Sequence, residues 1–138
     1  QEKNQNKKPV FLKIAPDLTR EQLDEIIEII IETQLTGVIA TNTTITRENL
    51  NESREFVEAC GAGGLSGAPV LQMSVSVVRY LKEKSNNRFV VIGVGGIEDY
   101  TSAKQHLDAG ADLIQVYSGF IYTGPGLVKD ILRGLKKS

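Results

Sequence analysis

The sequence predicts an α/β fold of four consecutive parallel βα units, because short apolar runs alternate with helical patterns four times along the chain. The predicted strands are separated by intervals of roughly 27, 52 and 24 residues. The doubled middle interval indicates one unit that carries an insertion. Such repeats form either a small doubly wound sheet or half of an eight-stranded barrel. Since a whole barrel needs about 250 residues, this chain would be its C-terminal half.

The first unit begins with an apolar run, Val10 to Ile14, that ends at Ala15-Pro16. This is typical of a buried parallel strand, and Lys13 is its one polar residue. Thr19 and Gln22 form a capping-box pattern, which predicts a helix running to about Gln34. Apolar residues at helical spacing predict its buried face: Leu23, Ile26, Ile27, Ile30 and Ile31. Gly37 to Thr41 is the second predicted strand.

The segment from Asn42 to Pro69 is rich in Asn, Thr, Gly and Ser, with only a short helical patch at residues 52–59. Loops of this length inside compact domains are usually functional.

Residues 70–84 return to a helical pattern whose inward positions are Val70, Ser74, Val77, Val78 and Leu81. The remaining predicted strands are Phe89 to Ile92 and Leu113 to Tyr117. A helix is predicted from Asp99 to Ala109, N-capped by Asp99 and ended at Gly110. The last predicted helix spans Gly126 to Lys136.

Composition excludes several classes of function. The 16 Lys and Arg residues nearly balance the 17 Asp and Glu residues, so no basic field exists to hold nucleic acid. Single copies of cysteine (Cys60) and histidine (His106) exclude an internal disulfide and argue against a metal site. No apolar run reaches about 18 residues, so no membrane segment is expected. Cys60 is expected to be incidental and His106 to be a surface residue.

Residues 1–9 are predicted to be a polar linker, because they are lysine-rich and without periodicity. Residues 10–138 form the predicted domain.

Polar residues gather where the predicted strands lead into helices, which is where parallel sheets carry function. Lys13 is unusual in a buried strand unless it is paired or functional. The glycines at 93, 95 and 96, together with Tyr117-Ser118-Gly119, predict a phosphate-binding cradle. Thr41, Asn42 and Thr43 fit a polar ligand and ordinary turn chemistry equally well.

Six segments resemble, in order, the C-terminal half of class 2 dihydroorotate dehydrogenase, the quinone-dependent FMN enzyme of pyrimidine synthesis. The resemblance runs from about Val10 to the end of the chain. The segments are Lys13–Leu18, Gly37–Thr44, Gly63–Gly67, Ile92–Ile97, Ala109–Ala111 and Gln115–Tyr122.

The resemblance implies half of an FMN-binding TIM barrel and a role for each matching residue. Lys13 would lie beside the flavin ring, with Thr41 and Gly67 also contacting FMN. The FMN phosphate would be held by Gly96, Tyr117 and Ser118. Asn42 and Thr43 would hydrogen-bond dihydroorotate or orotate. In the family reaction the substrate passes a hydride to FMN, which a quinone then reoxidises.

The resemblance also implies what the chain lacks. The family's catalytic base, a serine in class 2, lies upstream of the matching segments, as do the other substrate asparagines and the quinone tunnel. We therefore expect no catalytic base in this chain, no activity of the chain alone, and a need for the N-terminal half of the barrel. The parent enzyme is expected to be peripheral to the cell membrane or the inner mitochondrial membrane, and this segment by itself soluble.

Two other readings fit the same residues. One is a different barrel enzyme, either another FMN oxidoreductase or a phosphosugar isomerase, although Lys13 and the Asn42-Thr43 pair argue against the isomerase. The other is a non-catalytic FMN- or phosphate-binding half-barrel module that works only with a partner chain.

Overall fold

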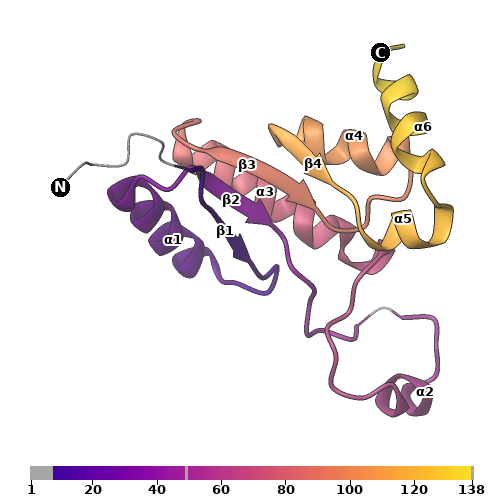
Figure 1. Cartoon of the computed structure of the whole chain (residues 1–138). Helices are drawn as coiled ribbons and strands as arrows, with labels where there is room; N and C mark the ends of the chain where they lie inside the picture. Colours follow the sequence, from indigo (N-terminus) through magenta and orange to yellow (C-terminus); the bar gives the residue numbers. More distant parts are fainter. Residues whose placement is uncertain (1–7, 49, 138) are drawn as a thin grey trace.

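The computed structural model describes residues 8–48 and 50–137 (Figure 1). Its strands are β1 (Phe11–Ile14), β2 (Gly37–Ala40), β3 (Val90–Val94) and β4 (Leu113–Gln115). Its α-helices are α1 (Arg20–Thr33), α2 (Arg54–Ala59), α3 (Leu71–Ser85), α4 (Tyr100–Asp108), α5 (Ser118–Thr123) and α6 (Gly126–Leu135). A 3-10 turn, η1 (Ala68–Val70), precedes α3.

The strands form one parallel sheet in the order β1-β2-β3-β4. The register places Lys13 beside Ile39, Ile39 beside Ile92, and Ile92 beside Leu113. All strands therefore end at the same edge of the sheet, and the loop that carries α2 extends beyond that edge (Figure 1).

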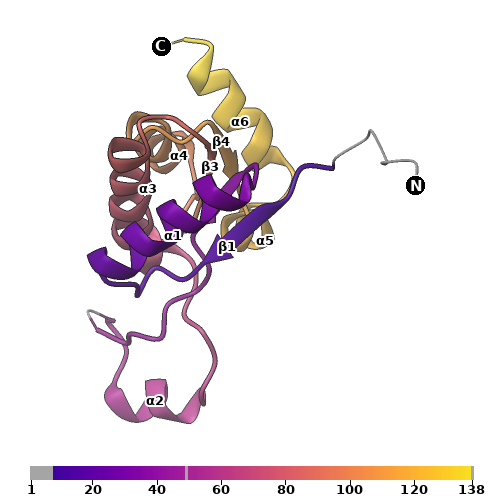
Figure 2. The ribbon, with the colours of Figure 1, turned by 90° about the vertical axis from the view of Figure 1, so that its left-hand side faces the viewer.

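Helices α1, α3 and α4 lie on one face of the sheet (Figure 2). The strand residues that point toward them are fully buried: Val38, Ala40 and Val91. Alternate positions point to the other face, where Ile39 and Ile92 are half-buried and Leu113 is 57% exposed. Because parallel sheets are normally covered on both faces, this second face is available for further packing.

The predicted helix starts are confirmed. Thr19 and Asp99 are both N-caps with complete capping boxes, in which the side chain of each cap accepts from the N–H three residues on. The predicted inward residues of α3 are all buried, and Leu23, Ile27 and Ile30 are the buried residues of α1. These helices are held to the sheet by the apolar faces that their periodicity predicts.

The end of the chain differs from the prediction at two points. Strand β4 ends at Gln115 rather than Tyr117, and an unpredicted helix, α5, begins at Ser118. A Cβ on Gly119 would lie only 2.2 Å from the carbonyl oxygen of Ile97. At Gly119 the chain has left the sheet and packs closely on the connection between β3 and α4. The periodicity of the sequence does not predict this contact. Strand β3 also continues to Val94, because Val94 pairs with Gln115.

The prediction that His106 is a surface residue is wrong, since its side chain is completely buried. It lies under the sheet against Gly93, where a Cβ on the glycine would come within 2.7 Å of the His106 Nδ1 atom. The missing side chain of Gly93 makes room for the imidazole. Of the predicted linker, residues 1–7 lie outside the described residues, and Lys8 and Pro9 have no regular secondary structure.

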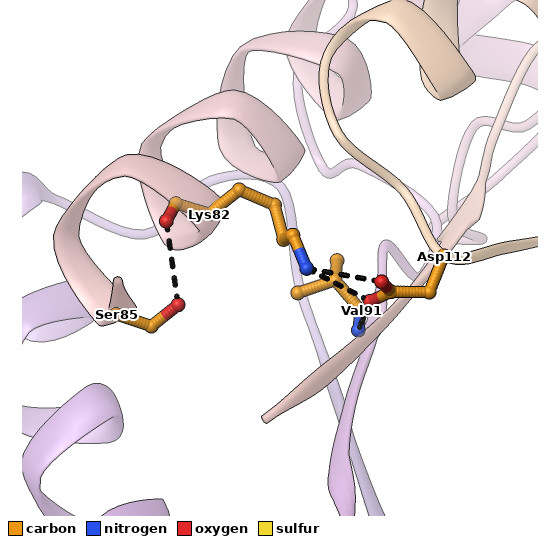
Figure 3. A network of polar contacts seen from close by, with 4 residues as sticks. All are labelled: Lys82, Ser85, Val91 and Asp112. Atoms are coloured by element: carbon orange, nitrogen blue, oxygen red, sulfur yellow. Dashed lines mark hydrogen bonds and ion pairs between the residues drawn. The ribbon is translucent and has the colours of Figure 1, made fainter. Parts of the chain in front are cut away.

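A polar network joins α3 to the adjacent ends of β3 and β4 (Figure 3). The Lys82 ammonium donates to both carboxylate oxygens of Asp112, at 3.1 and 3.0 Å. The same carboxylate accepts the Val91 N–H at 2.8 Å. Lys82 is only 11% exposed, so the pair is better shielded from water than the surface pair between Lys104 and Asp108.

We predict that Asp112→Ala lowers the free energy of unfolding by about 1–2 kcal/mol, because it removes a shielded ion pair and leaves the Val91 N–H without its acceptor. Asp108→Ala, which removes the exposed i,i+4 pair, should cost less than about 0.5 kcal/mol. Urea unfolding of both variants measures the difference. An equal loss of unfolding free energy in the two variants would show that the Asp112 network does not stabilise the fold more than a surface ion pair does.

We predict that stability falls as the pH drops below 6.5, because burial lowers the pKa of His106 from its ordinary value of 6.5. Below this pH the His106 ring takes up a proton in the unfolded chain but not in the folded chain. Well above it the ring is neutral in both states, so this loss of stability is absent. The slope is at most about 1.4 kcal/mol per pH unit. Urea midpoints at several pH values measure it, and His106→Gln, which has no titrating ring, should remove this part of the slope.

Candidate functional site

A pocket of about 240 Å³ lies at the carboxyl ends of the strands. Every site residue predicted from the sequence lines it: Lys13, Thr41, Asn42, Thr43, Gly67, Gly96, Tyr117 and Ser118. These residues come from the ends of β1, β2 and β4, the turn after β3, and the long loop. The structure therefore brings them together, while the role of each residue stays a prediction.

Backbone hydrogen bonds position the polar residues that follow β2. The Thr41 N–H donates to the Val94 carbonyl at 2.7 Å, and the Asn42 N–H donates to the Ile14 carbonyl at 2.7 Å. Each bond ties the end of β2 to the end of a neighbouring strand. The peptide bond between Ala40 and Thr41 is cis. Asn42 and Thr43 are exposed at the pocket, where a ligand can reach them.

The long loop is closed at its base by contacts between its two ends. Thr44 and Leu65 exchange two backbone hydrogen bonds, at 3.0 and 2.8 Å, and the Thr44 hydroxyl donates to Asp17. A Cβ on Gly64 would overlap the Thr43 side chain, so only glycine permits this approach. The segment that follows Leu65 thereby places Ser66 and Gly67 at the pocket.

Two further contacts hold the loop. The Arg47 guanidinium donates to the Gly63 carbonyl, and the Ser118 hydroxyl donates to the Ser66 hydroxyl at 2.9 Å. The second bond joins the end of the loop to the start of α5, across the pocket wall.

The turn after β3 needs glycine for both conformation and space. Gly95 and Gly96 have φ values of 129° and 69°, which side chains with a Cβ rarely adopt. A Cβ on Gly96 would lie 2.5 Å from that of Leu71 and 2.9 Å from the Leu71 backbone nitrogen. The turn therefore packs directly on the start of α3 and presents backbone, rather than side chains, to the pocket.

Lys13 is the one charged side chain among the described residues that line the pocket. It is exposed and has no hydrogen bond or ion pair with another described residue. No carboxylate belongs to a described residue that lines the pocket, so the Lys13 charge suits an anionic ligand.

Thr41 carries a polar atom that the chain leaves unsatisfied. Its side chain is 2% exposed, and its hydroxyl has no hydrogen-bond partner among the described residues. Such a group costs about 1–3 kcal/mol of stability. Because Thr41 lines the pocket, a ligand with a hydrogen-bonding edge would supply the missing partner.

Sequence reasoning assigned no role to two other residues of the pocket wall, Gln115 and Ser66. Gln115 is exposed at the end of β4 and is polar in an apolar strand, which is the same signal that identified Lys13. Nothing in the sequence around Ser66 predicts that it lines the pocket, apart from the neighbouring glycines. Its position depends on the contact between Thr44 and Leu65, which closes the loop.

Residues 8–48 and 50–137 contain neither a membrane-spanning helix nor a cluster of metal-binding side chains. No helix there is long and apolar enough to cross a membrane. No group of three or more His, Cys, Asp or Glu residues lies together in a way that could hold a metal ion.

The family model for dihydroorotate dehydrogenase matches residues 1–138, the whole chain. The chain belongs to the dihydroorotate dehydrogenase family. It is 55% identical over 134 residues to a quinone-type dihydroorotate dehydrogenase of Christiangramia forsetii, covering 95% of this chain and 38% of that protein. A relative with the same name from Vibrio vulnificus is 47% identical over 135 residues, covering 98% of this chain and 39% of that protein.

Solved structures agree with these relatives. The crystal structure of the Eimeria tenella DHODH in complex with ferulenol matches with a TM-score of 0.84 and 38% identity, covering 92% of this chain and 33% of that one. The prediction of consecutive parallel βα units from a TIM barrel is therefore confirmed. The chain spans about 38% of the length of the Christiangramia relative.

We predict that Thr41→Val leaves the stability of the unliganded chain unchanged or raises it by up to about 1 kcal/mol, because it removes an unsatisfied buried hydroxyl. Thr44→Val is the matched control. Its hydroxyl is equally buried but is bonded to Asp17, so this change should lower stability by about 1–2 kcal/mol. Thermal unfolding of both variants tests the contrast, and an equal loss in the two would show that the Thr41 hydroxyl is satisfied.

Proposed function

We propose that the pocket binds FMN and that the chain supplies the FMN- and orotate-binding half of a quinone-dependent dihydroorotate dehydrogenase. The observation that carries the proposal is the convergence of the predicted site residues on one pocket, with Lys13 as its only described charge, in a chain that belongs to this family. The orphaned Thr41 hydroxyl supports it, because the polar edge of a flavin offers hydrogen-bonding groups.

The phosphate of FMN would bind at the glycine turn after β3. Gly96 would contribute its backbone N–H, and the facing segment would contribute Tyr117 and Ser118. A backbone cradle without Cβ atoms lets an anion approach several donors closely. Gly67 suits a close approach of the ligand, since its φ of 82° favours glycine and the nearest atoms to the position of a Cβ there, on Glu98 and Ser118, are 3.9 Å away.

Lys13 and Thr41 would hold the flavin ring. Bound FMN would supply the hydride-accepting chemistry that no side chain of this pocket has. Lys13 lies near the end of β1 at the pocket, so its ammonium could stabilise negative charge on the ring. The Thr41 hydroxyl would gain the hydrogen-bond partner that it lacks in the chain alone.

Asn42 and Thr43 would bind dihydroorotate or orotate. Both are exposed at the pocket, beside the residues proposed to hold the flavin, and their amide and hydroxyl groups match the carbonyl and N–H groups of such a ring. Their place is set by the Asn42–Ile14 hydrogen bond and by the close contact of Thr43 with Gly64.

The partner of this chain would be the N-terminal half of the barrel. Strands β1 and β4 are sheet edges, and the face opposite the helices leaves Leu113 57% exposed. Both features would be covered by the further strands of a closed barrel. The catalytic base, the quinone site and the peripheral attachment of the parent enzyme to a membrane would belong to that half, so the chain alone would be inactive.

The test is FMN titration onto the purified chain, followed by quenching of flavin fluorescence. We expect saturable binding, weakened about five- to tenfold by Lys13→Met, because one partly shielded charge contact contributes about 1 kcal/mol. Lys129→Met, on the exposed surface of α6, should bind as the unchanged chain does. Absence of binding, or equal effects of the two variants, would overturn the cofactor role.

The same samples test the division of the active site. With FMN, dihydroorotate and an artificial quinone, the chain alone should show no turnover. Activity should appear when the chain is mixed with the part of the Christiangramia relative that it does not cover, prepared separately. Turnover by the chain alone would contradict the missing base, and binding without any rescue would favour the non-catalytic module.

A further inference from the structure

Side chains of α3 and α4 hydrogen-bond to the carbonyl groups of Val94, the last residue of β3, and of Gly95, the first residue of the glycine turn. The Ser74 hydroxyl, on α3, donates to the Val94 carbonyl at 2.6 Å. His106, on α4, lies with its Nε2 atom 2.9 Å from the Gly95 carbonyl oxygen. Since a carbonyl oxygen can only accept, His106 carries its proton on Nε2. The side chain that sequence reasoning assigned to the surface is thus in contact with the turn.

This contact determines where the next backbone donor points. The Gly95 carbonyl and the Gly96 N–H belong to one peptide group, and in a trans peptide they point in opposite directions. The bond to His106 holds the carbonyl toward the helices, so the Gly96 N–H faces away from them, on the side of the pocket that Gly96 lines. This N–H has no hydrogen-bond partner among the described residues.

The surroundings of His106 favour the neutral ring. Its Nδ1 atom is buried without a partner and lies against Gly93, so a second proton would have no acceptor. Burial lowers its pKa accordingly. Charged groups on its own helix and on the elements packed against it are either exposed or paired with each other. The pairs are Lys82 with Asp112, Lys104 with Asp108, and Arg133 with Asp130, and the exposed groups include Arg79, Glu83, Lys84 and Lys129.

We propose that His106 is a positioning residue for the anion site: its Nε2–H holds the Gly95 carbonyl in the helix layer and thereby turns the Gly96 N–H toward the bound anion. The inference rests on the proposed function in taking this pocket as the phosphate site. His106 touches neither cofactor nor substrate, and acts through the orientation of one peptide group.

Glutamine and methionine separate this role from packing. Both are similar in length, but only the glutamine amide can donate from the place of the histidine Nε2 atom. His106→Gln should therefore keep the turn, and His106→Met should fill the space and lose the bond. Thermal unfolding verifies that both variants fold.

Sulfate is the probe, because its charge does not change with pH in the working range, and its binding is followed at pH 7.5 by the backbone amide signals of Gly95 and Gly96. We expect His106→Gln to bind sulfate within about twofold of the unchanged chain and His106→Met to bind it about three- to tenfold more weakly, as expected for one hydrogen bond. Equal binding by the two variants would overturn the proposal.

A second measurement needs no ligand. His106 is the only histidine, so nitrogen-labelled histidine gives one set of ring signals. At pH 7.5 we expect a neutral ring protonated at Nε2, and a shift of the Gly96 amide signal in His106→Met but not in His106→Gln. A ring protonated at Nδ1, or an unmoved Gly96 signal, would overturn the inference. If the unchanged chain binds neither sulfate nor FMN, the proposed function fails, while these signals still decide the role of His106.

Discussion

The parallel, in-register pairing of β1 to β4 controls where every polar side chain of the pocket lies. Lys13 and Gln115 belong to opposite edges of the sheet and are far apart in the sequence, yet both strands end at the same rim. The register also brings the end of β2 against its neighbours, where Thr41 and Asn42 bond to Val94 and Ile14. Without this alignment the same residues would be scattered polar positions.

The helix layer supports the site as well as the core. Ser74 and His106 are fully buried among apolar side chains. Ser74 donates a hydrogen bond to the Val94 carbonyl and His106 donates one to the Gly95 carbonyl, both at the glycine turn. Burial of a polar group is unfavourable unless it is hydrogen-bonded, and the carbonyls at the turn are the acceptors that these two side chains need. Thr41 is the contrasting case, since its hydroxyl is buried with no acceptor. The hydrogen bonds of Ser74 and His106 shape the turn, whereas the Thr41 hydroxyl is available to a ligand because Thr41 lines the pocket.

The open face of the sheet and the membership in the dihydroorotate dehydrogenase family both fit the proposed division of the active site between this chain and the rest of a barrel. The chain matches about two fifths of its relatives' length and carries a complete helix layer on one side only. The described residues that line its pocket provide a cation, glycine backbone and polar side chains, and none of them is a carboxylate or a histidine. Such groups suit the binding of an anionic cofactor, and the proposed function accordingly assigns the catalytic base to the rest of the barrel.

The sequence by itself determined the order of strands and helices, the capping boxes at Thr19 and Asp99, and the residues that gather at the rim, because these depend on local periodicity and on strand ends. Tertiary structure alone decided the burial of His106, the start of α5 and the return of the long loop. His106 is buried because Gly93, on another element, has no Cβ, and the loop returns because Thr44 meets Leu65 and Asp17. Such contacts join residues distant in the sequence, and no local pattern records which of them will meet.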